Sequence, residues 1–299
     1  MAVGPARRAT LPAVVAVLVA VAVTCGAACG SEHGAALVDG GALGLSATLV
    51  QNREDVAPRR LQVKLTNGTS GQLRVVDVRL SWAGLEELPA AEQGVLYGVG
   101  QRTDLPVPYG DARCPEDLSS DSPPGTPIVA VATIEWPDGK RDEVAVPVSD
   151  VEGVLSLLYR ADCRRQFIEA AVGLELTGSW ERVDSGGEPT LRGELSVDRR
   201  NATGTITILD ISGSVLLNLR PAPGVGEPML TLGPSESAGA VPLDVTGSRC
   251  DAHALADSKQ TFLFQLELDL GDGPEGYVFT PSPDLRAMMQ QLINDHCEL

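Results

Sequence analysis

The residues that could carry out a reaction are sparse, because the chain has only three histidines. One of them stands between two acids: Asp251, His253 and Asp257 follow Cys250 within a short stretch. Imidazole and carboxylate groups are ligands that hard and borderline metal ions accept. A metal-dependent enzyme, which we keep as an alternative, would be centred on these three residues. We expect no metal and no cofactor, because three ligands on one short loop fall short of a complete site.

The signatures of common enzyme classes do not occur in the sequence. It has no Gly-x-Ser-x-Gly turn of a serine hydrolase, and neither a phosphate-binding loop nor a dinucleotide-binding fingerprint. The 40 acidic residues offer too many pairs for spacing to identify the carboxylates of a glycosidase. Trp82, Trp136 and Trp180 could stack on sugars, but the first two are in phase with apolar strand residues and are expected in the core. We therefore expect a protein that is not an enzyme.

The composition indicates a folded, acidic protein. The chain of 299 residues has 40 acidic and 23 basic residues, a net charge of -17, and 43% of its residues are hydrophobic. This apolar content is enough for a packed core. The charge argues against nucleic acid as a partner, because neutralising phosphates requires a basic face.

The N-terminus has the features of an export signal. Arg7 and Arg8 precede an uncharged apolar run from Leu11 to Val23, and small residues follow it. The run is shorter than the roughly 20 residues that span a bilayer comfortably. We therefore predict a signal peptide over residues 1–28. An uncleaved membrane anchor is the alternative.

The end of this segment, Gly26-Ala27-Ala28-Cys29, resembles the lipobox of bacterial lipoproteins, in which the cysteine is lipidated and becomes the new N-terminus. The sequence departs from that pattern at Gly26, where the family prefers Leu or another aliphatic residue. Cys25 competes as the lipid acceptor, but the threonine before it fits the pattern less well. The resemblance implies a protein anchored outside the cytoplasmic membrane by lipid on Cys29, with residues 29–43 as a tether. Cleavage after Ala28, giving a secreted protein, is the alternative.

An internal repeat organises the rest of the chain. The stretch 134–139, Ile-Glu-Trp-Pro-Asp-Gly, is matched by Leu-Asp-Leu-Gly-Asp-Gly at 268–273. In the same order, Pro147-x-x-Asp150 is matched by Pro281-x-x-Asp284, and an Arg-Cys pair occurs before each stretch. Two tandem domains of ordinary size follow, which we place at residues 44–168 and 169–299.

Within each copy the apolar residues mostly alternate, which predicts half-buried strands. Leu61, Val63 and Leu65 alternate with polar residues, Val76, Val78, Leu80 and Trp82 form a second such run, and the clearest apolar face extends from Phe262 to Leu270. Asp138-Gly139 and Asp272-Gly273 are placed where hairpin turns would join two strands. We therefore predict a mostly β protein made of two tandem Ig-like β-sandwich domains.

One element in each copy breaks the alternation. After Asp150 and Asp284 the apolar spacing becomes helical, and a carboxylate at that place can accept backbone N–H groups of a first turn. Each domain is therefore expected to close with one short capped α-helix.

Four cysteines remain after the signal, and four can pair in three ways. Each copy has one cysteine after an arginine and one at the end of its helix. Only the pairs Cys114–Cys163 and Cys250–Cys297 leave two equivalent, self-contained domains, and export permits their oxidation.

The stretch Arg-Cys-Asp-Ala-His at 249–253, with the strand and the cysteine-ended helix after it, resembles a group of uncharacterised exported proteins and lipoproteins of actinobacteria. The likeness covers mainly residues 241–297, and it implies location and fold without implying an activity. The expected function is that of a non-enzymatic cell-envelope lipoprotein, which presents β-sandwich surfaces to an unidentified envelope protein or ligand. A structural subunit of an envelope complex is a further alternative.

Overall fold

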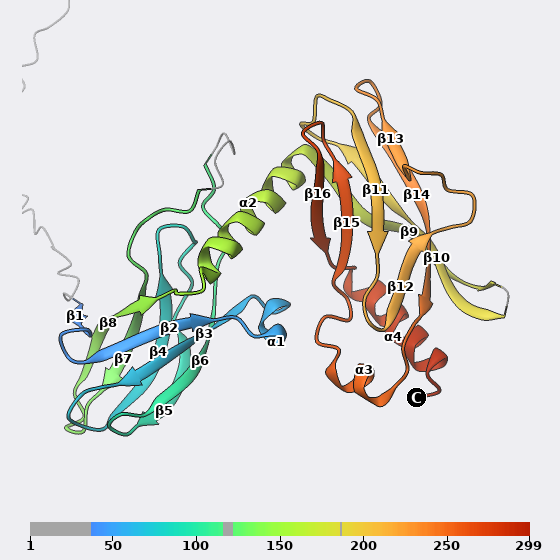
Figure 1. Ribbon diagram of the computed structural model, residues 1–299. Coiled ribbons are helices and arrows are strands. Elements are labelled where there is room, and N and C mark those ends of the chain that lie inside the picture. The colour runs from blue at the N-terminus through green and yellow to red at the C-terminus, as the bar shows by residue number, and fades with distance from the viewer. Residues whose placement is uncertain (1–36, 116–121, 186) are drawn as a thin grey trace, which may run out of the picture. The chain divides into compact units, whose positions relative to one another are not determined.

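The structure is a computed structural model that describes residues 37–115, 122–185 and 187–299. The predicted signal peptide, Cys25, Cys29 and the tether up to residue 36 lie outside the described residues. The end of the predicted tether was wrong, because Val38–Asp39 forms a strand of the first sheet and the folded part therefore begins before residue 44. Residues 37–299 cluster as one compact unit. That unit is mostly β (Figure 1). It contains two separate hydrophobic cores.

The first core is enclosed by one eight-stranded sheet in the order β5-β4-β7-β8-β2-β3-β6, with β1 beside β8. Apolar side chains from β2, β3 and β6 pack in the same core as those from β4, β7 and β8, so the sheet forms a sandwich. Both β1 and β2 pair with β8 in parallel, and the other pairs are antiparallel. The strands are β1 (Val38–Asp39), β2 (Leu45–Val50), β3 (Arg60–Asn67), β4 (Leu73–Ser81), β5 (Ala91–Tyr97), β6 (Arg102–Pro108), β7 (Val129–Glu135) and β8 (Arg141–Ser149).

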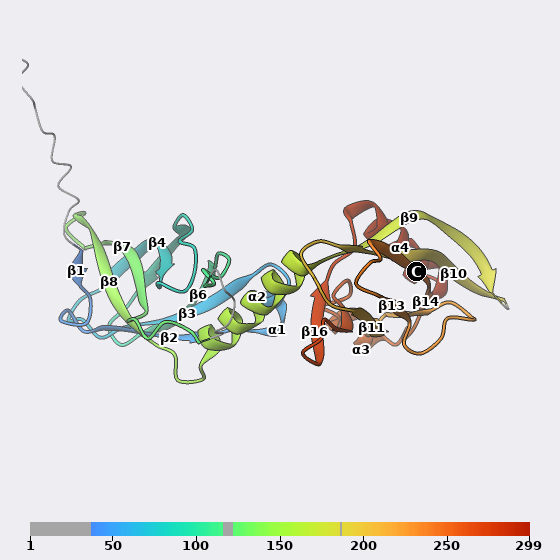
Figure 2. The same cartoon turned by 90° about the horizontal axis from the view of Figure 1, so that it is seen from above.

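The second core lies between two four-stranded sheets, in the orders β12-β14-β10-β9 and β13-β11-β15-β16. The long β9–β10 hairpin extends beyond the other strands of its sheet (Figures 1 and 2). The strands are β9 (Val172–Ser185), β10 (Glu188–Arg199), β11 (Ile206–Ser212), β12 (Leu217–Pro221), β13 (Leu230–Leu232), β14 (Ala238–Gly247), β15 (Phe264–Asp269) and β16 (Pro274–Phe279).

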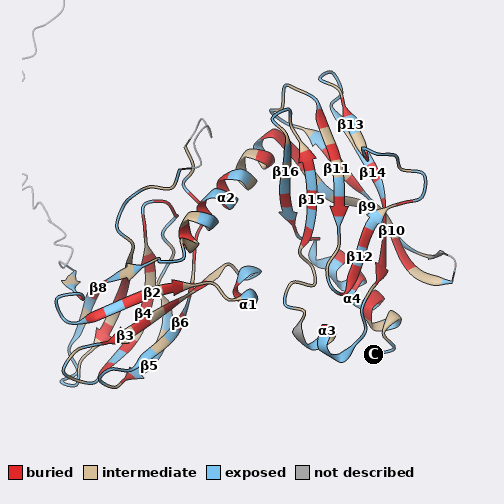
Figure 3. Ribbon diagram, in the orientation of Figure 1, coloured by how far each residue is buried: buried red, intermediate tan, exposed pale blue. Residues whose placement is uncertain are grey.

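The predicted alternation is visible as buried and exposed residues that take turns along the strands (Figure 3). In β3 the predicted inner residues are fully buried, and in β15 Phe264, Leu266 and Leu268 are buried. In β4 the prediction was wrong at one position. A bulge between Val75 and Asp77 shifts the phase, so that Val75 and not Val76 is buried.

Both predicted Asp-Gly turns join antiparallel strands. Gly139 lies between β7 and β8 with φ of 83°, and Gly273 lies just before β16 with φ of 111°. Positive φ is unfavourable for residues with a Cβ atom, which explains glycine at both turns.

The described residues contain four helices: α1 (Arg53–Val56), α2 (Val154–Ala171), α3 (Ala252–Asp257) and α4 (Pro283–His296). The two cysteine-bearing helices, α2 and α4, lie where the repeat predicts helices. The expectation of one short helix in each half was not met, because α1 and α3 are additional helices and α2 is 18 residues long. Asp150 accepts hydrogen bonds from the amides of Val154 and Leu155 at 2.8 and 2.9 Å, as expected. The capping role of Asp284 was wrong, because Ser282 is the N-cap and its hydroxyl accepts from Leu285 N at 3.3 Å.

Helix α2 contributes side chains to both cores. Leu155, Tyr159 and Cys163 belong to the first core, whereas Ile168 belongs to the second. The boundary expected between residues 168 and 169 therefore lies inside one continuous helix.

Two disulfides attach the cysteine-bearing helices to the loops that follow β6 and β14. Cys114 is bonded to Cys163 (the first disulfide) and Cys250 to Cys297 (the second disulfide), as the repeat predicts. Cys163 is 5% exposed, whereas Cys250 is exposed. Disulfides of this kind are typical of proteins that mature outside the cytoplasm. None of the helices in the described ranges is long and apolar enough to cross a membrane.

Candidate functional site

The predicted candidates Asp251 and His253 lie at the start of α3. Asp251 is the N-cap of this helix, and its Oδ1 accepts a hydrogen bond from Ala254 N at 3.0 Å. Its Oδ2 pairs with Arg249 at 2.9 Å. The hydrogen bond from Ala254, followed by the contact with Arg249, lowers the pKa of Asp251. Its carboxylate therefore already has two structural partners.

Two of the three candidate metal ligands, Asp251 and His253, have described side chains. His253 is exposed on α3, and the side chain of Asp257 lies outside the described part of the chain. Within the described ranges, no group of three His, Cys, Asp or Glu side chains is arranged to hold a metal ion. The short stretch after Cys250 is folded as helix α3, with Asp251 as its N-cap.

A hollow of about 500 Å³ adjoins this helix, and we call it the α3 hollow. It is formed by the turn after β11, by α3 with the loop after it, by the outward faces of β15 and β16, and by Arg53 and Val56 of α1. His253 lines it, together with Arg249 and Lys259. The predicted site residues thus meet segments that are distant in sequence.

The charges around the α3 hollow differ from those of the whole chain. Arg53, Arg249 and Lys259 line it, and none of the described residues that line it is Asp or Glu. In a protein with a net charge of -17, such a carboxylate-free lining is unusual. The ion pair of Arg249 with Asp251 is exposed, with 58% and 48% of the two side chains accessible, so water screens it.

Local geometry explains why the backbone folds tightly here. A Cβ atom on Gly213 would approach Leu217 O to 2.0 Å, so only glycine fits the turn after β11. In this turn Ser214 N donates to Leu217 O at 2.8 Å. On the other side of the hollow, Ala254 is 4% exposed and packs in the second core, which fixes α3.

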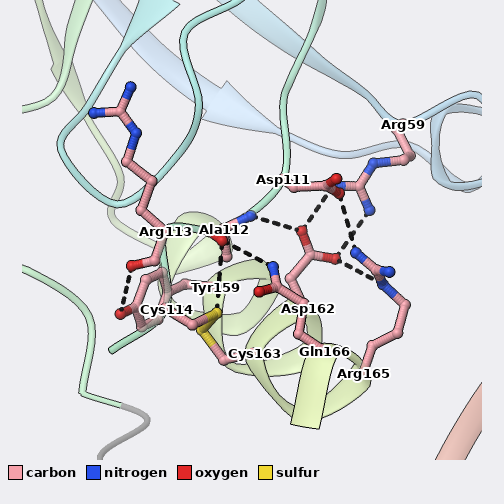
Figure 4. The surroundings of a disulfide bond; sticks show 10 residues. All are labelled: Arg59, Asp111, Ala112, Arg113, Cys114, Tyr159, Asp162, Cys163, Arg165 and Gln166. Atoms are coloured by element: carbon pink, nitrogen blue, oxygen red, sulfur yellow. Dashed lines mark hydrogen bonds and ion pairs between the residues drawn. A yellow bond between two sulfur atoms is a disulfide. The ribbon is translucent and has the colours of Figure 1, made fainter. Parts of the chain in front are cut away.

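A second group of charged residues surrounds the first disulfide (Figure 4). Asp162, one residue before Cys163, is 7% exposed and accepts hydrogen bonds from Arg59 Nη1 and Nη2 at 2.9 and 2.7 Å. The same carboxylate accepts from Ala112 N at 3.2 Å, and Arg165 Nε lies 3.7 Å away. Arg59 also lies over the Tyr109 ring at 4.7 Å. All these contacts hold the loop before Cys114 against α2.

Two other buried carboxylates are held in the same way. Asp244 is 3% exposed, and Arg192 binds both of its oxygens, at 2.7 and 2.9 Å. Asp55 contacts Arg60 and accepts a hydrogen bond from Gln62. Buried carboxylates that are paired in this way are structural, because each is compensated by a cation within its own fold.

The three tryptophans are explained by packing. Trp82 is 8% exposed and meets Tyr159 edge to face at 5.8 Å, as predicted for a core residue. Trp136 is half-buried, beside a small hollow of about 350 Å³, and its Nε1 donates to Asp142 at 2.9 Å. The Trp180 ring covers Gly193, where a Cβ atom would approach it to 2.3 Å. Trp180 therefore serves the packing of the β9–β10 hairpin.

Comparisons with known proteins give no family for the chain. No family model matches it, and no curated protein does. The crystal structure of CBD12 from CALX1.2 is similar at 12% identity, with 82% of this chain and 86% of that chain covered and a TM-score of 0.19. The exo-chitosanase CsxA of Amycolatopsis orientalis is similar at 12% identity over 79% of this chain and 26% of that chain, with a TM-score of 0.18. This chain spans about a quarter of the length of the exo-chitosanase. Neither similarity bears on activity.

Sequence reasoning found His253 but missed Lys259, Gln260 and the turn at Gly213. Lysine is rare in this chain, so its place next to the candidate stretch was one available signal. The proximity of the turn after β11 could not be read from spacing, because it depends on the long-range pairing of β11 with β15.

Proposed function

We propose that this protein is an exported binding protein, tethered to the membrane by lipid on Cys29, and that it is not an enzyme. Its two halves, each built around one of the two hydrophobic cores, act as tandem Ig-like β-sandwich domains, and each half contains one disulfide. The α3 hollow is the surface that meets an envelope protein or ligand.

One observation carries the binding role. The α3 hollow combines unburied cations with exposed apolar side chains, among them Val215 and Val278, which are 38% and 51% exposed. The buried carboxylates Asp55, Asp162 and Asp244, by contrast, are engaged with arginines inside the two folds. Exposed apolar groups rimmed by polar ones are typical of binding surfaces.

The binding role is tested by photo-crosslinking in intact cells. A photo-reactive residue replaces Val278 in the hollow, and the control carries it at Val99, which is 63% exposed and lies between β5 and β6 in the other half of the chain. We expect a discrete adduct from position 278 and none from position 99. Equal labelling at both positions, or none at 278, would contradict the proposal.

The proposed lipid anchor and the proposal that the protein is not an enzyme are tested separately. Mass spectrometry of the mature N-terminus should find diacylated Cys29, and an unmodified terminus on protein from the medium would contradict lipidation. Metal analysis of the purified protein should find no bound ion. Stoichiometric metal that is lost on His253→Ala would favour the metal-dependent alternative.

A further inference from the structure

We infer that the α3 hollow binds a small amphiphilic anion: a carboxylate or phosphate group contacted by Lys259 and Arg249, followed by a short apolar segment. This inference rests on the proposed function, because it names the chemistry that the same surface would recognise.

The first argument concerns charge. A chain with a net charge of -17 repels anions over most of its surface, so an anion can approach closely only where carboxylates are locally absent. The α3 hollow meets that condition among its described lining residues. Lys259 is exposed there, and no described carboxylate lies within ion-pair distance of its ammonium group. Arg249 brings a second cation, whose pairing with Asp251 is screened by water.

The second argument concerns the apolar part of the lining. Val215, Val278 and Leu263 line the same hollow, and the first two are exposed. Binding becomes more favourable when a ligand removes exposed apolar side chains from water. A wholly polar ion would leave them exposed, whereas an anion with a few methylenes would cover them.

The third argument concerns hydrogen bonding. Gln260 and Gln265 line the hollow and offer amide N–H donors. The hydroxyl oxygen of Ser214, also in the lining, is buried and has no hydrogen-bond partner among the described residues. Neutral donors next to cations suit the several oxygen atoms of a carboxylate or phosphate group.

The test is isothermal titration calorimetry on the full mature chain with Cys29→Ser, which avoids detergent. Octanoate and octyl phosphate serve as amphiphilic anions, acetate as an anion without the apolar segment, and octanol as the apolar segment without charge. We expect both amphiphilic anions to bind and acetate to bind more weakly, by roughly fourfold for each methylene that the hollow covers. Octanol should bind about tenfold more weakly than octanoate, because two exposed charge contacts are lost.

Two variants and a control locate the binding. Lys259→Gln should weaken octanoate binding by about threefold, and the double variant with Arg249→Gln by about tenfold. The control Arg286→Gln removes an exposed cation from α4, outside the hollow, and should leave binding unchanged. All three variants should keep the thermal unfolding curve of the parent, because they are exposed. A preference for octanoate over octyl phosphate would identify carboxylates as the ligand class, and the reverse would identify phosphates.

Two outcomes would overturn the inference: octanol binding as tightly as octanoate, or octanoate binding that survives the double variant. If no anion binds while residue 278 still crosslinks in cells, the ligand chemistry is wrong and the binding role stands. If both experiments fail, the proposed function fails with the inference.

Discussion

The substitution Asp162→Asn should destabilise the first core by about 2 kcal/mol. The side chain of Asp162 is 9% exposed and accepts two hydrogen bonds from Arg59 and one from Ala112 N. Removing one partner of a buried ion pair costs roughly 3–5 kcal/mol, because a charge is left uncompensated. Here the cost is smaller, because the Arg59 side chain is 36% exposed and keeps Asp111 at 3.2 Å.

Urea unfolding of the oxidised mature protein measures this cost. Glu143→Gln is the matched control, because Glu143 binds Arg79 at 3.0 Å but is 47% exposed, so its loss should cost less than about 1 kcal/mol. A double-mutant cycle with Arg59→Gln should give a coupling energy of about 1–2 kcal/mol. An Asp162→Asn protein as stable as the parent, or a coupling energy near zero, would refute the reasoning.

Three further outcomes are expected. Arg199 donates to the carbonyl oxygens of residues 202, 204, 232, 233 and 236. Arg199→Gln should therefore lower the free energy of unfolding in urea by about 3 kcal/mol, whereas the control Arg286→Gln should leave it almost unchanged. Equal losses in the two variants would contradict this. Burial raises the pKa of Tyr97 and Tyr277 to about 12, above the value near 10 of unfolded tyrosine, so their contribution to stability is complete below about pH 10 and is lost as the pH rises toward 12. A spectrophotometric titration in which all tyrosines ionise near pH 10 before unfolding would exclude this. The exposed second disulfide should be reduced by a water-soluble phosphine before the first, and mass spectrometry of alkylated peptides would reveal the opposite order.

The sequence predicted those features that depend on short-range pattern or on the repeat. The alternation at β3 and β15 identified buried faces, and the duplicated Arg-Cys pairs identified both disulfides. The turns at Gly139 and Gly273 followed from the same matches.

The errors arose where a neighbouring element decides the outcome. The bulge at Val75 changes which residues face the core, and no periodicity reveals it. At α4 a serine two residues before Asp284 caps the helix, because α4 begins at Pro283, one residue before Asp284, whereas α2 begins four residues after Asp150. Helix α2 continues past Cys163 to Ala171, because its last turns find apolar partners in the second core.

The candidate site was predictable only in part. Asp251 and His253 were identified by residue type as alternative metal ligands, but the sequence analysis did not predict that Asp251 caps α3. The lining of the α3 hollow combines the turn at Gly213 with Lys259 and Val278, and the pairing of β11, β15 and β16 within one sheet brings these segments together.

The most direct test of the account is a non-reducing peptide map of the protein purified from its own cells. If each half has its own disulfide and the protein is in an oxidising compartment, one peptide pair should join Cys114 to Cys163 and another should join Cys250 to Cys297. No free thiol should be found at these four positions. Free thiols, or a disulfide between the front and rear halves, would contradict both the architecture and the location.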